Sequence, residues 1–258
     1  MPGDCVLIST MKKLLFGCLI FITACQSATA TPAPLPSPTA TLPPTLIPVT
    51  DTPAPTPTLQ LSPTPFPRFF TNEFDSPLEG WVTLQAGNDF VPTIKTENSS
   101  LILQMNSPYS WTYAIYGAED YANVHVETNF ENRGGSPSSV GLVCRYSEEN
   151  GWFEYNVSTD GTYNLLYGIW LDVGIANYLP ITDGSSNLIQ PSGAVQQISL
   201  LCSGTALTLS INETVVRSID VARYELTEGK VGLTAASYEN TPIIAALDWV
   251  KVSDSPSP

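Results

Sequence analysis

The sequence predicts an all-β domain, a two-sheet antiparallel sandwich, placed after a disordered Pro/Thr-rich linker. Short runs of β-branched and aromatic residues recur through residues 68–258, and Gly, Asn, Asp and Pro interrupt them. No stretch of this region keeps a helical period. Residues 26–67 are instead of low complexity. We therefore divide the chain into a signal segment at 1–25, a linker at 26–67 and one domain at 68–258.

The first segment has the pattern of an export signal. Two lysines, Lys12 and Lys13, precede the apolar run Leu14–Ala24. This run is shorter than the roughly 20 residues that a membrane-spanning helix needs, and it suits a cleavable signal. The ending Ile-Thr-Ala-Cys, which closes on Cys25, resembles a bacterial lipobox. The resemblance implies that Cys25 carries lipid and becomes the mature N-terminus.

A lipidated Cys25 implies an extracytoplasmic protein, held at a bacterial membrane or cell surface through its lipid chains alone. The alternative is an ordinary signal peptide that is cut after Ala28 or Ala30. Residues 1–10 carry Asp4 and no positive charge, which does not fit the start of a signal. We therefore expect translation to begin at Met11.

The linker at 26–67 is expected to be extended. Proline recurs every second or third residue, and the only charged residue is Asp51. Proline removes backbone donors and fixes φ, and a segment of this composition cannot bury enough apolar surface to order itself. A polyproline-like spacer is the favoured interpretation, with a Pro-rich ligand for a partner protein as the alternative.

The charge of the chain limits its partners. The formal net charge is −14 at pH 7, and all acidic residues except Asp4 and Asp51 lie in the domain at 68–258. Such a domain repels polyanions, so nucleic acid and anionic lipid surfaces are not expected partners.

The predicted strands divide the domain into segments of ordinary strand length. About a dozen strands imply two packed sheets of roughly five to seven strands each. The predicted segments are 68–74, 90–96, 100–106, 111–117, 123–132, 138–147, 151–159, 162–170, 195–203, 206–212, 214–221, 230–237 and 243–253.

One hairpin allows its register to be predicted. The alternating apolar residues of its two strands are Phe153, Tyr155 and Val157, then Tyr163, Leu165 and Tyr167. A two-residue turn would pair Val157 with Asn164 and place the two sets on opposite faces. A three-residue loop over 159–161, with Gly161 in the left-handed region, pairs Val157 with Tyr163 instead. We predict this loop because it keeps both apolar sets on one face.

Two cysteines lie at core-facing positions of the domain. The inward sets of two further strands are Val140, Leu142, Cys144 and Tyr146, then Ile198, Leu200 and Cys202. Two buried cysteines in an exported chain favour a disulfide between Cys144 and Cys202. Closing a loop of this length stabilises a fold by about 4 kcal/mol in chain-entropy terms. The alternative is two separate buried thiols.

Four stretches of the domain resemble a known family. They are FDSPLEGW (74–81), VGLVCRYSEENGWFEYNVSTDGTYNLLYG (140–168), LLCSGTALTLSINETVVRSID (200–220), and the closing pair GKVGLTAAS and LDWVKVS. They resemble the concanavalin A-like lectin/glucanase jelly roll, in particular laminin-G-like and 3-keto-disaccharide hydrolase-like bacterial surface domains. The resemblance implies a jelly-roll sandwich over nearly the whole domain. The sequence departs from the family pattern at one hairpin tip, where Asn212-Glu213 stands in place of Asn-Gly.

The sequence leaves enzymatic activity open and favours a non-catalytic domain. Glycosidases of this fold place paired carboxylates on one strand in an E-x-D-x-x-E spacing. The chain has only Glu127 and Glu131, four apart, without an acidic residue between them. His125 alternates with apolar neighbours and is interpreted as a strand-face residue. We therefore name no catalytic residue.

A binding face is predicted on the second side of the hairpin. Its register places Trp152, Glu154 and Asn156 opposite the core, beside Asn164 and, from the preceding strand, Arg145. An aromatic plane with a carboxylate, amides and a guanidinium suits a sugar ring and its hydroxyls. The alternative is a solvated outer sheet face.

No cofactor is required by the sequence. The fold implied by the resemblance is in keeping with a structural calcium near the first and last strands, for which Asp75 and Asp248 are the candidate ligands.

We therefore expect a surface-anchored lipoprotein that presents a non-catalytic β-sandwich for binding carbohydrate or cell-wall glycan. Its expected partners are a glycan and, through the lipid anchor only, a membrane. The alternatives are a glycoside hydrolase of the same fold and a protein-interaction or adhesion module.

Overall fold

The computed structural model describes residues 65–89 and 91–255, all within the compact unit Leu61–Pro258. The predicted signal segment, Cys25, Met11 and almost all of the linker lie outside the described residues. Strands dominate the described part, and its only helical element is a 3-10 turn, η1, at Ala222–Tyr224. None of the described residues forms a helix long and apolar enough to cross a membrane.

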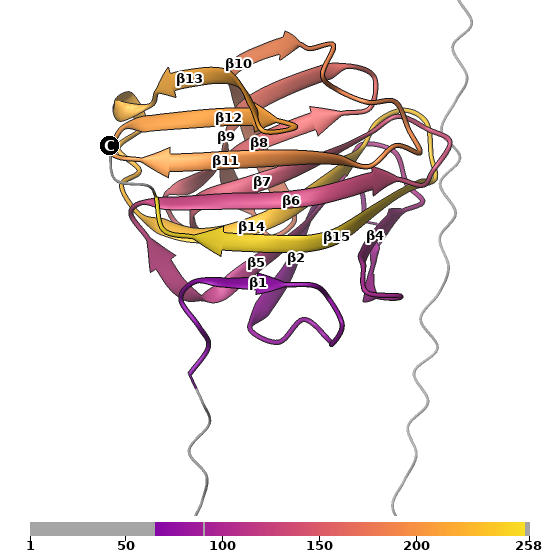
Figure 1. Ribbon diagram of the computed structural model, residues 1–258, viewed down its shortest axis with the longest axis horizontal. Coiled ribbons are helices and arrows are strands. Elements are labelled where there is room, and N and C mark those ends of the chain that lie inside the picture. Colours follow the sequence, from indigo (N-terminus) through magenta and orange to yellow (C-terminus); the bar gives the residue numbers. More distant parts are fainter. Residues whose placement is uncertain (1–64, 90, 256–258) are drawn as a thin grey trace, which may run out of the picture. The chain divides into compact units, whose positions relative to one another are not determined.

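The first sheet is antiparallel and has the order β13-β12-β11-β6-β15-β4-β3, with β1 paired to β15. Figure 1 shows β13, β12, β11, β6 and β15 following one another from top to bottom as one layer. The strands are β1 Phe70–Asn72, β3 Thr93–Thr96, β4 Leu101–Met105, β6 Val124–Asn132, β11 Gln196–Ser203, β12 Ala206–Ile211, β13 Thr214–Asp220 and β15 Ile243–Ser253.

The second sheet lies behind the first in Figure 1 and has the order β10-β9-β8-β7-β14-β5-β2. Its strands are β2 Trp81–Gly87, β5 Ser110–Tyr121, β7 Ser138–Ser147, β8 Gly151–Ser158, β9 Thr162–Asp172, β10 Ile175–Ser185 and β14 Gly229–Ser237. Both layers are antiparallel throughout, so the predicted two-sheet sandwich is confirmed.

The core forms because each strand sends alternate side chains between the sheets. β6 shows this directly, since Val124, Val126, Thr128 and Phe130 are buried while the residues between them are half-exposed. In contrast, β7 and β8 are buried on both faces along almost their whole length. The second sheet therefore covers more than the sandwich core, and its outer face is also occupied.

Two strands were missed by the sequence prediction, and both are edges of the second sheet. β10 contains Pro180, Asp183 and Gly184, which are turn-forming residues. Proline is tolerated at a sheet edge and at bulges, and β10 has a bulge between Pro180 and Thr182. Edge strands pack on fewer neighbours, so their sequences carry a weaker strand signal.

The predicted disulfide is confirmed. Cys144 of β7 and Cys202 of β11 are bonded, with their Cα atoms 6.8 Å apart. These strands belong to different sheets, so the bond joins the two layers across the core.

The predicted hairpin register is also confirmed. Val157 pairs with Tyr163, and Gly161 has φ 95°, which a side-chain-bearing residue rarely adopts. At the tip of the β12–β13 hairpin, Ile211 pairs with Thr214 across a two-residue turn. Both turn residues have positive φ, 47° for Asn212 and 64° for Glu213. Glu213 therefore occupies a left-handed position at which the family has glycine.

The alternation predicted along β7 is wrong beyond Cys144. A bulge lies between Cys144 and Ser147, and Arg145 has φ 55°. The extra residue shifts the side chains that follow it. As a result Tyr146 leaves the sandwich core and joins the outer face of the sheet, which is the face predicted for Arg145.

Candidate functional site

Four of the five predicted ligand residues come together on the outer face of the second sheet. Trp152, Glu154 and Asn156 project from β8, and Asn164 projects from β9. Trp152 Nε1 donates to Glu154 Oε2 at 3.0 Å, and Asn156 Nδ2 donates to Glu154 Oε1 at 2.8 Å and to Asn164 Oδ1 at 3.2 Å. Glu154 is thus the centre of one hydrogen-bond network.

The centre of this network is closed to solvent, and only Asn164 at its edge is half-buried. Trp152 and Glu154 are 0% exposed and Asn156 is 3% exposed. The ring of Trp170 lies 5.0 Å from that of Trp152, and Tyr146 lies 5.6 Å away on the same face. An open aromatic plane at Trp152, as expected for a sugar platform, is therefore not what the structure shows. We call this region the enclosed face.

The enclosed face is closed because the second sheet curls until its two edge strands meet. The N–H of Gly87 in β2 donates to the carbonyl of Gly174, which links β9 to β10, at 3.1 Å. Trp111 of β5 and Tyr178 of β10 stack across the face with centroids 5.1 Å apart. The prediction missed this cover because it missed β2 and β10.

A glycine makes the packing under Trp152 feasible. Gly168 of β9 lies directly opposite Trp152. A Cβ atom at Gly168 would lie 2.3 Å from Cε2 of Trp152, which no real side chain could accommodate. The indole therefore packs directly against the backbone of β9 only because position 168 has no side chain.

Burial changes the acidity of the central groups. Burial raises the pKa of the Glu154 carboxyl, although hydrogen bonds from Trp152, Asn156 and Tyr113 oppose the shift. Tyr113 donates its hydroxyl to Glu154 Oε2 at 2.9 Å and shares a 2.7 Å hydrogen bond with Tyr178. Burial also raises the pKa of Tyr113 well above its ordinary value, and the charge of Glu154 adds to that shift.

Arg145 is not part of this network. Its guanidinium donates to the carbonyls of Leu226 at 2.7 Å and Ala122 at 3.2 Å, and also to the carbonyl of Gly204. Because the bulge at Arg145 turns its side chain away from the enclosed face, the guanidinium fastens three connecting segments and contacts no other predicted ligand residue.

An open cavity adjoins the enclosed face where β2 meets the β9–β10 hairpin. We call it the edge pocket; its volume is about 720 Å³. Trp170 and Tyr146 form its aromatic surface and are joined by a 3.0 Å hydrogen bond from Trp170 Nε1 to the Tyr146 hydroxyl. Its polar lining includes Thr83, Gln85, Asn88, Asp89, Glu148 and Asp172.

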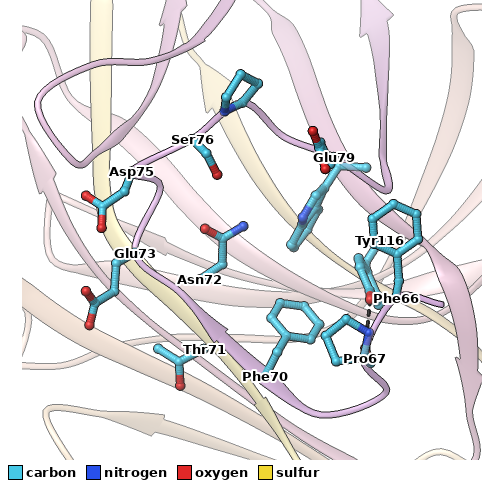
Figure 2. A pocket seen from close by; sticks show the side chains of 12 residues that line it. Phe66, Pro67, Phe70, Thr71, Asn72, Glu73, Asp75, Ser76, Glu79 and Tyr116 are labelled. Atoms are coloured by element: carbon cyan, nitrogen blue, oxygen red, sulfur yellow. Dashed lines mark hydrogen bonds between the residues drawn. The ribbon is translucent and has the colours of Figure 1, made fainter. Parts of the chain in front are cut away.

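A second open cavity lies at the start of the domain and is shown in Figure 2. We call it the terminal pocket; its volume is about 410 Å³. Its lining residues are Phe66, Pro67, Phe70, Thr71, Asn72, Glu73, Asp75, Ser76, Pro77, Glu79, Trp81 and Tyr116. The sequence motif at 74–81 contributes to this cavity, but the prediction did not identify it as a pocket.

The two predicted calcium ligands lie in different settings. Asp75 is exposed and lines the terminal pocket, whereas Asp248 is half-buried on β15. Within residues 65–89 and 91–255, no group of three or more His, Cys, Asp and Glu side chains could hold a metal ion. The calcium stays a prediction.

His125 lies on the outward-facing side of β6, half-buried, as its alternation indicated. Its Nδ1 is 3.6 Å from Glu127 Oε2, and Glu127 pairs with Lys251 at 3.0 Å. Burial lowers the pKa of His125, and the Glu127 charge opposes this shift.

Comparisons with known proteins place the fold. No protein-family profile matches the chain, and no curated protein sequence matches it. Solved structures do match. A Bacillus subtilis protein of unknown function with a galectin-like fold has 14% identity and a TM-score of 0.52, covering 72% of this chain and 94% of that one.

Two sugar-active enzymes match equally well. A Bacillus licheniformis β-glucanase has 11% identity and a TM-score of 0.51, covering 72% of this chain and 98% of its own. A glycosidic hydrolase has 13% identity and a TM-score of 0.52, covering 76% and 100%. At these identities the likeness shows the fold alone: the domain has the two-sheet jelly-roll fold of these structures, which is the fold that the sequence resemblance implied.

Proposed function

We propose that this protein is a non-catalytic glycan-binding module and that the glycan lies in the edge pocket. The half-exposed indole of Trp170 carries this proposal, because it forms part of an open cavity beside carboxylate, amide and hydroxyl groups. A sugar places its apolar C–H face on an indole and directs its hydroxyls to such polar groups. The matching structures named as a glucanase and a glycosidic hydrolase support carbohydrate as the ligand class.

The size of the edge pocket agrees with this ligand class. A volume of about 720 Å³ lies within the range of roughly 300–1,000 Å³ that small-ligand sites occupy. The exposed tip of the β9–β10 hairpin borders the cavity with Leu171, Val173 and Ile175, which are 67%, 96% and 55% exposed. These aliphatic side chains extend the apolar surface beyond Trp170.

The arrangement around Glu154 favours binding over hydrolysis. Retaining glycosidases need two carboxyl groups about 5–5.5 Å apart, and inverting enzymes need about 6.5–9.5 Å. The residues paired with Glu154 on the flanking strands are Val143 and Leu166, which are apolar. Glu154 is also fully buried, so a glycosidic bond has no access to it in this conformation.

The predicted anchor completes the proposal. Lipid on Cys25 and an extended linker would hold the module away from a bacterial membrane, where it could reach cell-wall or external glycan. Metabolic labelling of cells with a lipid analogue tests the anchor: the label is expected on the wild type and lost in Cys25→Ser. Label retained in Cys25→Ser would contradict it.

The glycan site is tested with the full chain on a glycan array, followed by calorimetry with the strongest ligand. Trp170→Ala should weaken binding by about 10- to 100-fold, because one aromatic stacking contact and its buried area are lost. Trp249→Ala, on β15 of the other sheet, is the matched control and should bind as the wild type does. No ligand on the array, or equal loss in both variants, would overturn the proposal.

The hydrolase alternative has its own readout. The raised pKa of Glu154 is a property that general acids share. Reducing sugar released from a panel of glucans, and lost in Glu154→Gln, would replace binding by catalysis. A flat baseline over the panel agrees with a binding module.

A further inference from the structure

The terminal pocket is separate from the edge pocket, and β2 is the one strand that contributes residues to both. The two cavities share no lining residue. Residues before β1, β1 itself, the β1–β2 connection, the start of β2 and Tyr116 of β5 surround the terminal pocket. It is therefore a second place where a ligand of different chemistry can bind.

One side of the terminal pocket is aromatic. The ring of Tyr116 lies 4.6 Å from that of Phe70 and 5.4 Å from that of Trp81. Phe66 adds a fourth ring that is 46% exposed, and the Tyr116 hydroxyl fixes the adjoining backbone by donating to the carbonyl of Pro67 at 2.7 Å. Figure 2 shows Phe66, Phe70 and Tyr116 gathered on one side of the cavity.

The opposite side of the pocket is acidic. Glu73 and Asp75 lie across from the rings in Figure 2, whereas Glu79 borders the cavity on the side of Tyr116. All three carboxylates are exposed, and among the described residues none of them takes part in an ion pair.

No basic residue compensates these charges from within the described lining of the pocket. Arg68 is the nearest cation in the sequence, but it pairs with Glu119 at 3.0 Å and lies over the rings of Phe69 and Tyr121. Lys251 lies opposite Thr71 in the β1–β15 pairing, but it pairs with Glu127 at 3.0 Å. The pocket therefore combines aromatic ring faces with carboxylates that have no ion pair among the described residues, and both features attract a cation.

The cation that fits this lining is organic. In the described part of the chain no three acidic side chains converge closely enough for a metal ion, and a bare metal ion would leave the aromatic wall without a role. An alkylammonium group places its polarised methyl or methylene groups on ring faces while its charge is balanced by carboxylates at a longer distance.

We propose that the terminal pocket binds a small organic cation through an alkylammonium group. The rings of Phe66, Phe70 and Trp81 contact its alkyl groups, and Glu73, Asp75 and Glu79 balance its charge. The edge pocket also contains carboxylates, but its aromatic surface is Trp170 and Tyr146 alone, within a larger volume. The compact aromatic wall therefore distinguishes the terminal pocket as the cation site.

Choline is the probe, titrated into the full chain by calorimetry at low ionic strength. We expect saturable binding that weakens as salt is added, because exposed charges are screened. The neutral isostere 3,3-dimethylbutan-1-ol should bind at least about tenfold more weakly, since it keeps the shape and loses the cation–π attraction. Equal binding of the two compounds, or no binding of choline, would overturn the proposal.

Two triple variants with the same change in charge locate the site. Glu73→Gln/Asp75→Asn/Glu79→Gln should weaken choline binding about tenfold or more. Asp89→Asn/Glu148→Gln/Asp172→Asn, in the edge pocket, should change it less than about twofold, a size expected for screened, distant charges. The reverse pattern would place the cation in the edge pocket and overturn the proposal.

Phe66→Ala tests the aromatic wall without opening the core, because this side chain is 46% exposed. A loss of about three- to tenfold in choline affinity is expected from one cation–π contact. Displacement of choline by calcium, with calcium affinity lost in the same triple variant, would assign the carboxylates to a metal instead. Glycan binding should be unchanged in all terminal-pocket variants, so this inference and the proposed function can fail independently.

Discussion

The enclosed face and the terminal pocket contain the same kinds of side chain in opposite arrangements. In the enclosed face, Glu154 accepts three hydrogen bonds from Trp152, Tyr113 and Asn156 and is shut off from water. In the terminal pocket, aromatic rings face carboxylates that have no ion pair among the described residues. The difference arises because two edge strands close over the first region, whereas none of the strands in the described residues covers the second. Aromatic and acidic residues thus stabilise the fold where strands cover them, and they are open to a ligand where strands do not.

Trp152→Ala is expected to have the largest effect on stability among the variants that test this contrast. The indole packs against several aromatic rings at the centre of the enclosed face, so its removal should lower the free energy of unfolding by about 3–5 kcal/mol. Denaturant unfolding measures this loss. Choline affinity of the remaining folded protein should be unchanged, and a parallel loss there would contradict the independence of the two regions.

Removal of the disulfide should come next in size. Cys144→Ala/Cys202→Ala frees the unfolded chain from a cross-link between residues 58 apart, so stability should fall by about 2–4 kcal/mol. Thermal unfolding with and without reductant checks this. Reductant should lower the melting temperature of the wild type and leave that of the double variant unchanged. Equal sensitivity of the two proteins would contradict a disulfide in solution.

Glu154→Gln tests the enclosed face through the pH dependence of the free energy of unfolding. Because burial raises the pKa of folded Glu154, the folded protein holds this proton to a higher pH than the unfolded chain does. The stability that this group contributes is therefore complete below its ordinary pKa and is lost as pH rises through the folded value.

The difference in unfolding free energy, wild type minus Glu154→Gln, should thus fall from about pH 4 upward by at most about 1.4 kcal/mol per pH unit. Denaturant unfolding at several pH values measures it, with Glu148→Gln at an exposed position as the control for loss of one charge. A difference that rises with pH would show that the enclosed network prefers the carboxylate.

The smallest effect is expected outside both regions, at the β12–β13 turn. Glu213 has φ 64°, a conformation in which glycine avoids the steric cost of a Cβ atom. Glu213→Gly should therefore raise stability by about 0.5–1 kcal/mol. Glu225→Gly, also at a positive φ, provides a second position for the same measurement. Destabilisation at Glu213 would mean that its side chain has a role the backbone geometry does not reveal.

The sequence predicted the parts of the fold that depend on local alternation. The apolar sets around Phe153 and Tyr163 required a three-residue loop, and the structure has it. The same alternation, continued from Tyr167 to residue 170, puts Trp170 on the outer side of β9, so this part of the site could have been predicted although our sequence analysis did not assign it. The bulge at Arg145 could not have been predicted from the sequence. One inserted residue moves every later side chain of the strand to the opposite face, without a marked change in composition.

The sequence by itself determined the class of fold, the inward cysteines and the acidic character of the domain, and it carries the pattern from which we predict an export signal. All of these depend on residue type and on a period of two along single strands. Only the tertiary structure decided that Trp152 and Glu154 are buried while Trp170, Phe66 and Trp81 border open cavities. That choice depends on which strands meet at the sheet edges, and contacts between residues far apart in the chain leave no periodic signal along it.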